Sequence, residues 1–157
     1  MSGKQCISGW KRHEKKVFLL ACVLLTLVCA AALADVKINS TNFPDSSFRQ
    51  YVKSELAGGK SVMTDAEAAA VTEIRCYERG IKTLKGIEFF PNLATLNAET
   101  NELTELDLGA NPRLKEVHVM QNYSLTSINV SKNRLLEVLD VTRITFPDDE
   151  AAGRRKR

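Results

Sequence analysis

Residues 93–111 read LATLNAETNELTELDLGAN, and this stretch contains the repeat that decides the fold. Its first half has apolar residues at the first, fourth and sixth positions. The same half-pattern starts at four places, separated by 22, 21 and 22 residues: Val71, Leu93, Leu114 and Leu136. A period of this size predicts a solenoid, in which each unit buries its apolar face against its neighbours. We therefore expect an α+β fold with short parallel strands from residue 71 to residue 146.

An asparagine follows the apolar half-patterns. An amide at an inward turn can donate and accept hydrogen bonds, and it can satisfy backbone groups of neighbouring units that are otherwise buried unpaired. Four residues are expected to form this structural ladder: Asn101, Asn111, Asn122 and Asn133. The spacing lengthens by one residue between positions 122 and 125, which predicts a bulge in a surface turn.

Residues 35–70 are predicted to form a helical cap ahead of the repeats. Asp45 is a suitable N-cap for a first helix with apolar residues at helical spacing, and Gly58-Gly59 ends that helix. A second helix starts at Thr64, with Glu67 three residues later as in a capping box. Because the end of a solenoid exposes its core to water, two helices at this place are expected to cover the first unit.

Residues 1–34 have the composition of a secretory signal peptide. Basic residues precede an apolar run from Val17 to Ala34, and the run ends in a small-x-small triplet. We expect cleavage after Ala34 and a secreted or cell-surface protein. The alternatives are an uncleaved signal anchor, in which only the leader contacts the membrane, and a lipoprotein modified at Cys22.

Net charge changes sign when the two ends are set aside. The whole chain has 22 basic and 19 acidic residues, a net charge of +3. The leader contributes five basic residues and one acid, and the last four positions are all basic, so residues 35–153 have 13 basic and 18 acidic residues, net −5. This body lacks the basic excess that nucleic-acid binding requires. Residues 147–157 are predicted to be a polar, basic tail.

Cys76 is the one cysteine that follows residue 34. No intramolecular disulfide is then available, so packing alone must hold the fold together. Cys76 occupies an apolar position of the repeat, which predicts a small buried side chain. The alternative is a reactive thiol, which would need exposure and a lowered pKa.

The repeat of residues 93–111 resembles the leucine-rich repeats of bacterial secreted and cell-surface proteins, whose units are about 21 residues long. Residues 38–52, which include Phe43-Pro44-Asp45, are similar to the region that precedes the repeats in that family. Residues 81–93 are similar to the junction between that region and the array. The resemblance covers residues 38–141, and it implies a short leucine-rich repeat solenoid with an N-terminal helical cap.

Many relatives carry an EF-hand-like loop between the cap helices, and this chain departs from that pattern. The positions that hold the acidic ligands of the loop are here Leu56, Gly58 and Lys60. An apolar residue, a glycine and a lysine supply no carboxylate, and only Glu67 remains. We therefore expect no metal site and no cofactor.

Residues on either side of each buried strand position should face outward, because side chains alternate along a strand. These outward rows are expected to line the concave face, which is the usual binding surface of solenoids. The candidate ligand-binding residues are Glu73, Arg75, Tyr77, Thr95, Asn97, Glu99, Glu116, His118 and Asp140.

The mixture of charged, amide, imidazole and aromatic groups in these rows favours a domain that binds protein or carbohydrate. A solvated face without a partner, and a structural spacer or truncated remnant of a larger surface protein, are the alternatives. A hydrolase would have to combine His118 and Asp140 with Ser124 or Ser127, without an oxyanion hole or a nucleophile elbow, so no catalytic residue is assigned. No closing cap follows Val141, so end-to-end self-association through an apolar end is also expected.

Overall fold

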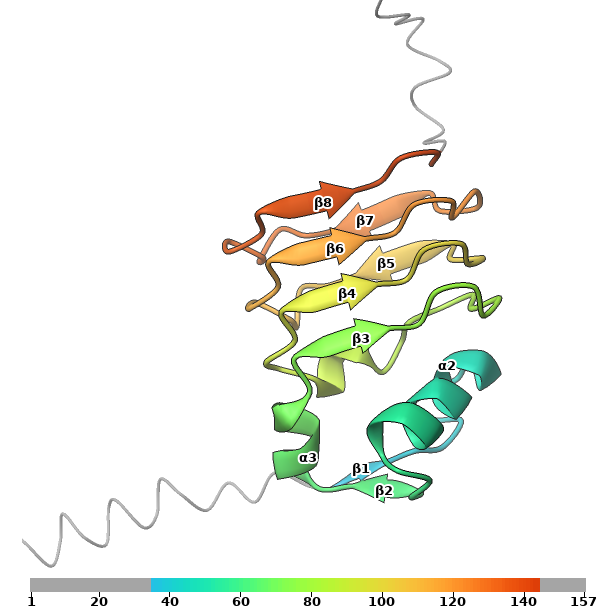
Figure 1. Cartoon of the computed structure of the whole chain (residues 1–157), viewed down its shortest axis with the longest axis vertical. Helices are drawn as coiled ribbons and strands as arrows, with labels where there is room; N and C mark the ends of the chain where they lie inside the picture. The colour runs from blue at the N-terminus through green and yellow to red at the C-terminus, as the bar shows by residue number, and fades with distance from the viewer. Residues whose placement is uncertain (1–34, 145–157) are drawn as a thin grey trace, which may run out of the picture. The chain divides into compact units, whose positions relative to one another are not determined.

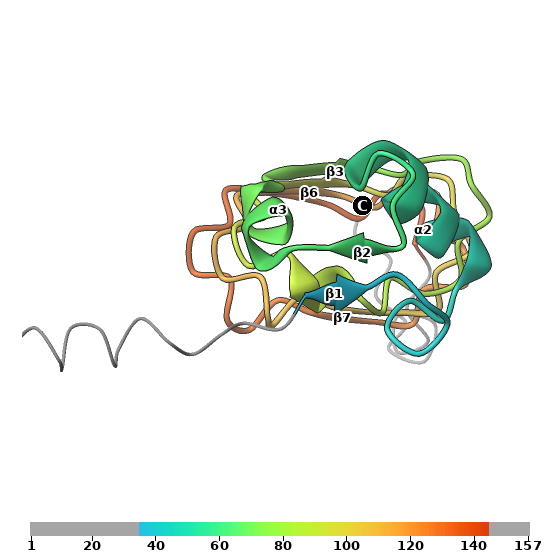
Figure 2. The same cartoon turned by 90° about the horizontal axis from the view of Figure 1, so that it is seen from below.

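A computed structural model describes residues 35–144, which form a solenoid of stacked units (Figure 1). A four-stranded parallel sheet has the order β3 (Glu73–Arg75), β4 (Thr95–Asn97), β6 (Glu116–His118), β8 (Val138–Asp140). A two-stranded parallel sheet consists of β5 (Glu105–Asp107) and β7 (Ser127–Asn129). The two sheets lie on opposite sides of the coil (Figure 2). The predicted fold, a short parallel solenoid with helices at its N-terminal end, is confirmed.

The strands stack one unit apart because the fourth position of each half-pattern is buried. Ile74 pairs with Leu96, and Leu96 pairs with Val117, in parallel register. All three side chains are fully buried. Burial of a side chain of this size contributes about 1.5–3 kcal/mol, so a shift of one residue, which would turn these side chains outward, is strongly disfavoured.

The extra residue of the third unit lies in a surface turn, as the spacing predicts. The N–H of Leu125 donates to the carbonyl of Asn122 at 3.0 Å, and Tyr123 between them is 64% exposed. Leu125 itself is fully buried, as is Leu103 one unit earlier. The insertion is therefore absorbed without displacing the core.

Two short helices form the predicted cap, α2 (Ser46–Tyr51) and α3 (Asp65–Ala70). The carboxylate of Asp45 accepts from the N–H of Phe48, and Thr64 and Glu67 form the capping box of α3. The sequence predicted that the first helix continues to Gly58-Gly59, but it indicated no strand in residues 35–70. The π-helical turn η1 (Val52–Leu56) continues α2, and β1 (Val36–Lys37) pairs antiparallel with β2 (Val62–Met63).

Side chains of the cap bind the backbone of the first unit directly. The hydroxyl of Tyr51 accepts from the N–H of Arg75 at 2.9 Å. The second carboxylate oxygen of Asp45 accepts from the N–H of Lys82 at 2.9 Å. The guanidinium of Arg79 lies 4.9 Å from the centre of the Tyr51 ring, within the range of a cation–π contact. The cap is therefore joined to the array by polar contacts as well as by apolar packing.

An aromatic cluster fills the space between the cap and the first unit. The Phe43 ring packs against Phe48, with centroids 5.9 Å apart, and against Phe89, with centroids 5.6 Å apart. Gly86 admits this ring, because a Cβ at that position would lie 2.3 Å from the ring and 2.8 Å from the carbonyl of Asn42. Gly86 also has a φ of 108°, a backbone conformation that residues with a side chain rarely adopt.

One non-glycine residue per unit adopts the left-handed conformation, at the same place in every turn after the four-stranded sheet. These residues and their φ angles are Glu78 (55°), Thr100 (53°), Gln121 (58°) and Arg143 (64°). In the second and third units the next residue is a ladder asparagine, Asn101 or Asn122. The turn therefore directs the amide inward at the cost of local strain.

The last described unit is open to solvent. Leu139 occupies the position of the buried Ile74, Leu96 and Val117, yet it is 39% exposed, and Leu135 is 53% exposed. Across residues 35–144 no helix has the length and apolar character needed to cross a membrane. The predicted signal peptide (1–34), the end of the predicted array (145–146) and the predicted basic tail (147–157) lie outside the described residues.

Candidate ligand-binding face

The outward side of the four-stranded sheet, called the binding face below, brings the candidate residues together in register. One row consists of Glu73, Thr95, Glu116 and Val138. The next row consists of Arg75, Asn97, His118 and Asp140. Adjacent strands are about 4.8 Å apart, so neighbouring side chains of one row are within reach of each other and of one ligand.

A third row lies just beyond the strands, because the parallel hydrogen bonding continues past them. The N–H of Glu78 donates to the carbonyl of Glu99 at 3.1 Å, and the N–H of Thr100 donates to the carbonyl of Met120 at 2.9 Å. Tyr77 therefore lies beside Glu99 on the same face, and its side chain is 51% exposed. The face ends in an exposed aromatic ring next to a carboxylate.

Contacts within the face hold several of its polar groups in place. The guanidinium of Arg75 donates to the Glu73 carboxylate at 2.7 Å, and this hydrogen bond raises the pKa of Arg75. Asn97 accepts from the N–H of Glu99 at 3.2 Å and donates to its carboxylate at 3.3 Å. Such groups lose less rotamer freedom when a ligand binds than free side chains do.

His118 and Asp140 are neighbours in the second row, and the hydrogen bonds of the Asp140 side chain go to Thr142. The Asp140 carboxylate accepts from the hydroxyl and the N–H of Thr142, at 2.6 and 3.0 Å, and these hydrogen bonds lower the pKa of Asp140. Ser127 lies on β7, in the sheet on the other side of the coil. Ser127 therefore cannot act as a nucleophile for His118.

The ladder asparagines are all buried, and they bind backbone groups of adjacent units. Asn101 accepts from the N–H groups of Arg79 and Ile81 and donates to the carbonyl of Cys76 at 2.9 Å. Asn122 accepts from the N–H of Leu103 at 3.1 Å, one unit earlier. These amides therefore serve both backbone donors and backbone acceptors.

The asparagines on the other side of the coil are used only as donors. Asn111 donates to the carbonyls of Ile87 and Phe90, both at 2.9 Å. Asn133 donates to the carbonyls of Leu108 and Asn111. The side-chain oxygens (Oδ1) of Asn111 and Asn133 are buried and have no hydrogen-bond partner in the described part of the chain. The side-chain amides of Asn101 and Asn122 therefore use both their donor and their acceptor groups, whereas those of Asn111 and Asn133 use only their donor groups.

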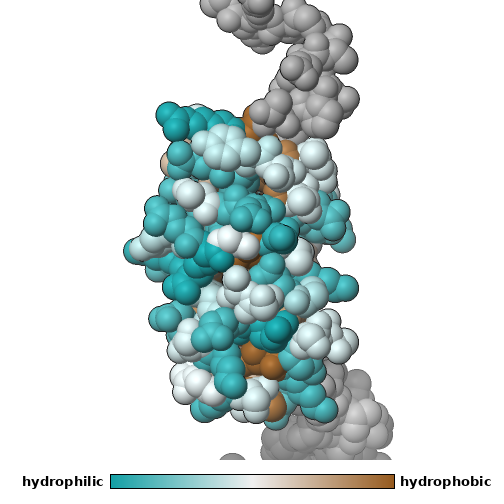
Figure 3. Space-filling model, turned by 90° about the vertical axis from the view of Figure 1, so that its right-hand side faces the viewer, coloured by the Kyte–Doolittle hydropathy of each residue, from teal (hydrophilic) through white to brown (hydrophobic). Residues whose placement is uncertain are grey.

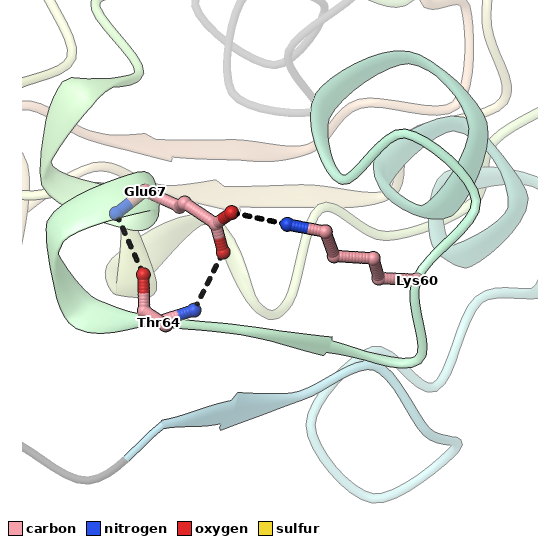
Figure 4. Close-up of polar contacts among 3 residues, drawn as sticks. All are labelled: Lys60, Thr64 and Glu67. Carbon is pink, nitrogen blue, oxygen red and sulfur yellow. Dashed lines mark hydrogen bonds and ion pairs between the residues drawn. The ribbon is translucent and has the colours of Figure 1, made fainter.

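The loop that precedes α3 holds a lysine against its one acidic neighbour (Figure 4). The ammonium of Lys60 lies 2.5 Å from one oxygen of Glu67, and the other oxygen accepts from the N–H of Thr64 at 2.9 Å. The hydrogen bond from Lys60, followed by that from Thr64, lowers the pKa of Glu67. Within residues 35–144, no three His, Cys, Asp or Glu side chains are grouped as a metal ion would require.

Cys76 is fully buried, and burial raises the pKa of its thiol to about 12. The thiolate that nucleophilic and redox chemistry requires is therefore almost absent at neutral pH. The prediction of a small buried side chain is confirmed.

A groove of about 730 Å³ lies on the opposite side of the coil from the binding face, and the sequence analysis did not identify it. It runs over β5 and β7 and along the 3₁₀ turn η2 (Ile87–Phe89) of the first unit. The available signal was the first unit itself, in which Ile81 and Leu84 match Leu103 and Leu106 but Gly86 stands at the position of Leu108. We call this hollow the β5–β7 groove.

The edge of the coil between the two sheets is mostly hydrophilic, with small separate apolar patches (Figure 3). This edge carries the turns that follow the strands of the four-stranded sheet. It therefore presents no broad apolar contact surface.

Comparison with solved structures identifies the fold. The functional domain of InlJ from Listeria monocytogenes, which includes a cysteine ladder, matches 73% of this chain with 23% identity and a TM-score of 0.54. The chain has a leucine-rich repeat fold. Two further solved structures from Listeria monocytogenes are an internalin (inlF), with 19% identity and a TM-score of 0.46, and an internalin C2 (inlC2), with 16% identity and a TM-score of 0.44.

This leucine-rich repeat chain spans only part of the proteins it matches. It covers 30% of the InlJ chain, 48% of the inlF chain and 71% of the inlC2 chain. The match to inlF includes 74% of this chain, and the match to inlC2 includes 73%. No family model matches the sequence, and no curated protein matches it.

Proposed function

We propose that this leucine-rich repeat domain binds a protein or glycan ligand through its binding face, without catalysis. The observation that carries the proposal is the register of the four-stranded sheet, which aligns Arg75, Asn97 and His118 on adjacent strands. A regular array of polar groups across stacked strands suits recognition of an extended ligand.

The chemistry of the face supports the same proposal. Arg75 and Asn97 contact polar neighbours that fix their orientation, and the exposed Tyr77 ring offers apolar area with a polar tip. Arginine and tyrosine are among the residues that contribute most to binding energy at interfaces. Acidic, basic and amide groups alternate over a short distance, so a ligand is selected by its pattern of charges and hydrogen bonds.

The test is a triple substitution, Arg75→Ala with Asn97→Ala and His118→Ala, assayed on immobilised glycans and proteins. The matched control replaces Arg113, Lys115 and Arg134, which are exposed and lie outside both the binding face and the β5–β7 groove. We expect the first variant to lose binding while its thermal unfolding stays unchanged, and the control to bind normally. Equal binding by both variants would rule out the face.

We also propose that the domain acts outside the cell, at the surface or after secretion. This rests on the leader of residues 1–34, with its basic start and its apolar run ending at Ala34. N-terminal sequencing of the exported protein should give a chain that begins at Asp35. A chain that retains Val17 would contradict cleavage and would support the signal anchor.

The exposed apolar residues of the last described unit favour a second candidate function, that of a spacer in a longer array. Leu139 is 39% exposed, whereas the residues at the same position of the earlier units, Ile74, Leu96 and Val117, are fully buried. End-to-end self-association would cover the same surface. Sedimentation of the wild type and of Leu139→Lys distinguishes the two, because only a self-associating chain becomes smaller on substitution.

A further inference from the structure

The outer edge of β8 is open in the described part of the chain, where this strand pairs with β6 alone (Figure 1). The bonds between β6 and β8 show which backbone groups are involved. The carbonyl of Lys115 accepts from the N–H of Glu137 at 2.8 Å. The N–H of Val119 donates to the carbonyl of Asp140 at 3.0 Å. One unit later the equivalent groups are the carbonyl of Glu137 and the N–H of Val141, and neither has a partner among the described residues.

Leu139 adds one donor and one acceptor to this edge. The carbonyl of Asp140 points toward β6, because it accepts from Val119 there. Consecutive residues of a strand direct their backbone groups to alternate sides, so the N–H and C=O of Leu139 point away from β6. In chain order the edge therefore presents an acceptor at Glu137, a donor and an acceptor at Leu139, and a donor at Val141. An open edge of this kind can pair with a further strand.

The apolar side chains of the last described unit favour a second copy of this chain as the occupant. Leu139 is 39% exposed, although the equivalent residues of earlier units are fully buried. Val141 and Ile144 of the same unit are only partly buried. When two copies meet at this end about a two-fold axis at Leu139, the apolar end of each chain covers that of the other. The contact has the same character as the one between successive units inside the solenoid.

Charges beside β8 fit the same arrangement. Glu137 precedes the strand and Arg143 follows it, and both are exposed. In antiparallel pairing about Leu139, Glu137 of one chain lies diagonally across from Arg143 of the other, within reach of long side chains. The two-fold axis makes this contact twice. The charge of Asp140 lies opposite the apolar Val138, so the strand sets no like charges against each other.

We propose that two copies of this chain pair antiparallel through β8, with the two-fold axis at Leu139. In this register the N–H and C=O of one Leu139 bond to those of the other, and each Val141 N–H donates to the Glu137 carbonyl of the other chain. The proposal rests on the end-to-end self-association named above, and it adds the strand and the register. The two four-stranded sheets then join into one continuous sheet, which presents both binding faces on the same side.

Sedimentation of the protein recovered after export, over a range of concentrations, should show a monomer–dimer equilibrium. Arg143→Glu should weaken dimerisation about tenfold or more, because it sets like charges against each other at both contacts. Adding Glu137→Lys should restore dimerisation, since it reverses the pair. Both changes suit the fold, because Glu78 and Lys115 occupy the equivalent positions of earlier units. Arg113→Glu is the matched control, at an exposed residue of an inner unit, and it should dimerise like the wild type.

Amide hydrogen exchange tests the strand pairing itself. Exchange at Leu139 and Val141 should slow as the protein concentration rises, because these N–H groups gain their acceptors only in the dimer. Protection that is independent of concentration would overturn the proposal and would indicate residues 145–157 of the same chain as the occupant.

The remaining outcomes separate this proposal from the earlier ones. Dimers without protection at Leu139 and Val141 would overturn the strand pairing and leave self-association through apolar contacts intact. Failure of Glu137→Lys to rescue Arg143→Glu would overturn the register. A chain that is monomeric at every concentration would overturn the dimer altogether, while ligand binding by the binding face, which is measured separately, would stand.

Discussion

The hydroxyl oxygen of Tyr51, in the last turn of α2, accepts a hydrogen bond from the backbone N–H of Arg75, in the first strand of the array. This single contact satisfies a backbone donor at the outer edge of the four-stranded sheet, where the described residues contain no earlier strand to accept it. The cap therefore contributes an acceptor that a preceding unit would otherwise supply.

Tyr51→Phe should lower the free energy of unfolding by about 1–2 kcal/mol, because it leaves the Arg75 N–H without its acceptor. The ring and its contact with Arg79 remain. Tyr77→Phe is the control, since the Tyr77 ring is half-exposed and its loss of a hydroxyl should be nearly neutral. Urea unfolding of both variants measures the difference, and equal midpoints would contradict the role of the Tyr51 hydroxyl.

Asn101→Ala should cost more stability than Asn111→Ala. The first substitution orphans two backbone donors as well as backbone acceptors, whereas the second orphans acceptors alone. Each buried group left unpaired costs about 1–3 kcal/mol. Chemical denaturation measures the free energy of unfolding that each variant loses. A larger loss for Asn111→Ala would contradict the expected order.

Gly86→Ala should destabilise the fold by about 2–4 kcal/mol, from a left-handed backbone and a clash with the Phe43 ring. Gly58→Ala separates the two causes. Gly58 also has a positive φ, 57°, but a Cβ there would have nothing within 4 Å. Its cost should be about 1 kcal/mol, from the backbone alone. Thermal unfolding compares them; similar losses would mean that the Phe43 ring moves aside freely.

Thr100→Gly should raise the free energy of unfolding by about 0.5–1 kcal/mol, because a β-branched residue is strained at a φ of 53° and glycine is not. The gain is reduced by the loss of the hydrogen bond from the Thr100 hydroxyl to Gln121. Thr104→Gly, at an exposed residue that lacks a positive φ, should instead lower stability. The opposite signs, measured by urea unfolding, are the expected result, and destabilisation at both positions would refute the strain.

The thiol of Cys76 should make the fold sensitive to alkaline pH. Its pKa is near 9 when the chain is unfolded and about 12 in the folded protein, so its contribution is complete below pH 9 and falls as pH rises toward 12. The slope is about 1.4 kcal/mol per pH unit in that window. Cys76→Val places the residue of the equivalent position, Val119, at the site and removes the group. Unfolding curves from pH 8 to pH 11 should therefore diverge, with the wild type losing stability faster; parallel curves would refute the linkage.

The repeat predicted the two sheets because burial follows the pattern closely. Ile74, Leu96 and Val117 have to point inward, and alternation then places Arg75, Asn97 and His118 on one outer face. Helix starts were equally readable, since Asp45 and Thr64 act through short-range hydrogen bonds within three residues. The arrangement of the candidate face could therefore be predicted, whereas its ligand could not.

The features that sequence reasoning missed depend on contacts between distant residues or carry no periodic signal. The strands β1 and β2 have two residues each, too few to produce alternation. The left-handed residues of the four turns share no residue type, because the hydrogen bonds between units, and not a local preference, impose their conformation. The groove lies where residues 83–85 of the first unit form no strand beside β5, and a repeat pattern does not predict such a local departure.

The exposure of Leu139 makes the two ends of the described solenoid different from each other. Each unit depends on its neighbours, the first is held by the cap, and the last described one has a neighbour on one side only. Order should therefore spread outward from the cap, and thermal opening should begin at the far end and travel back toward it.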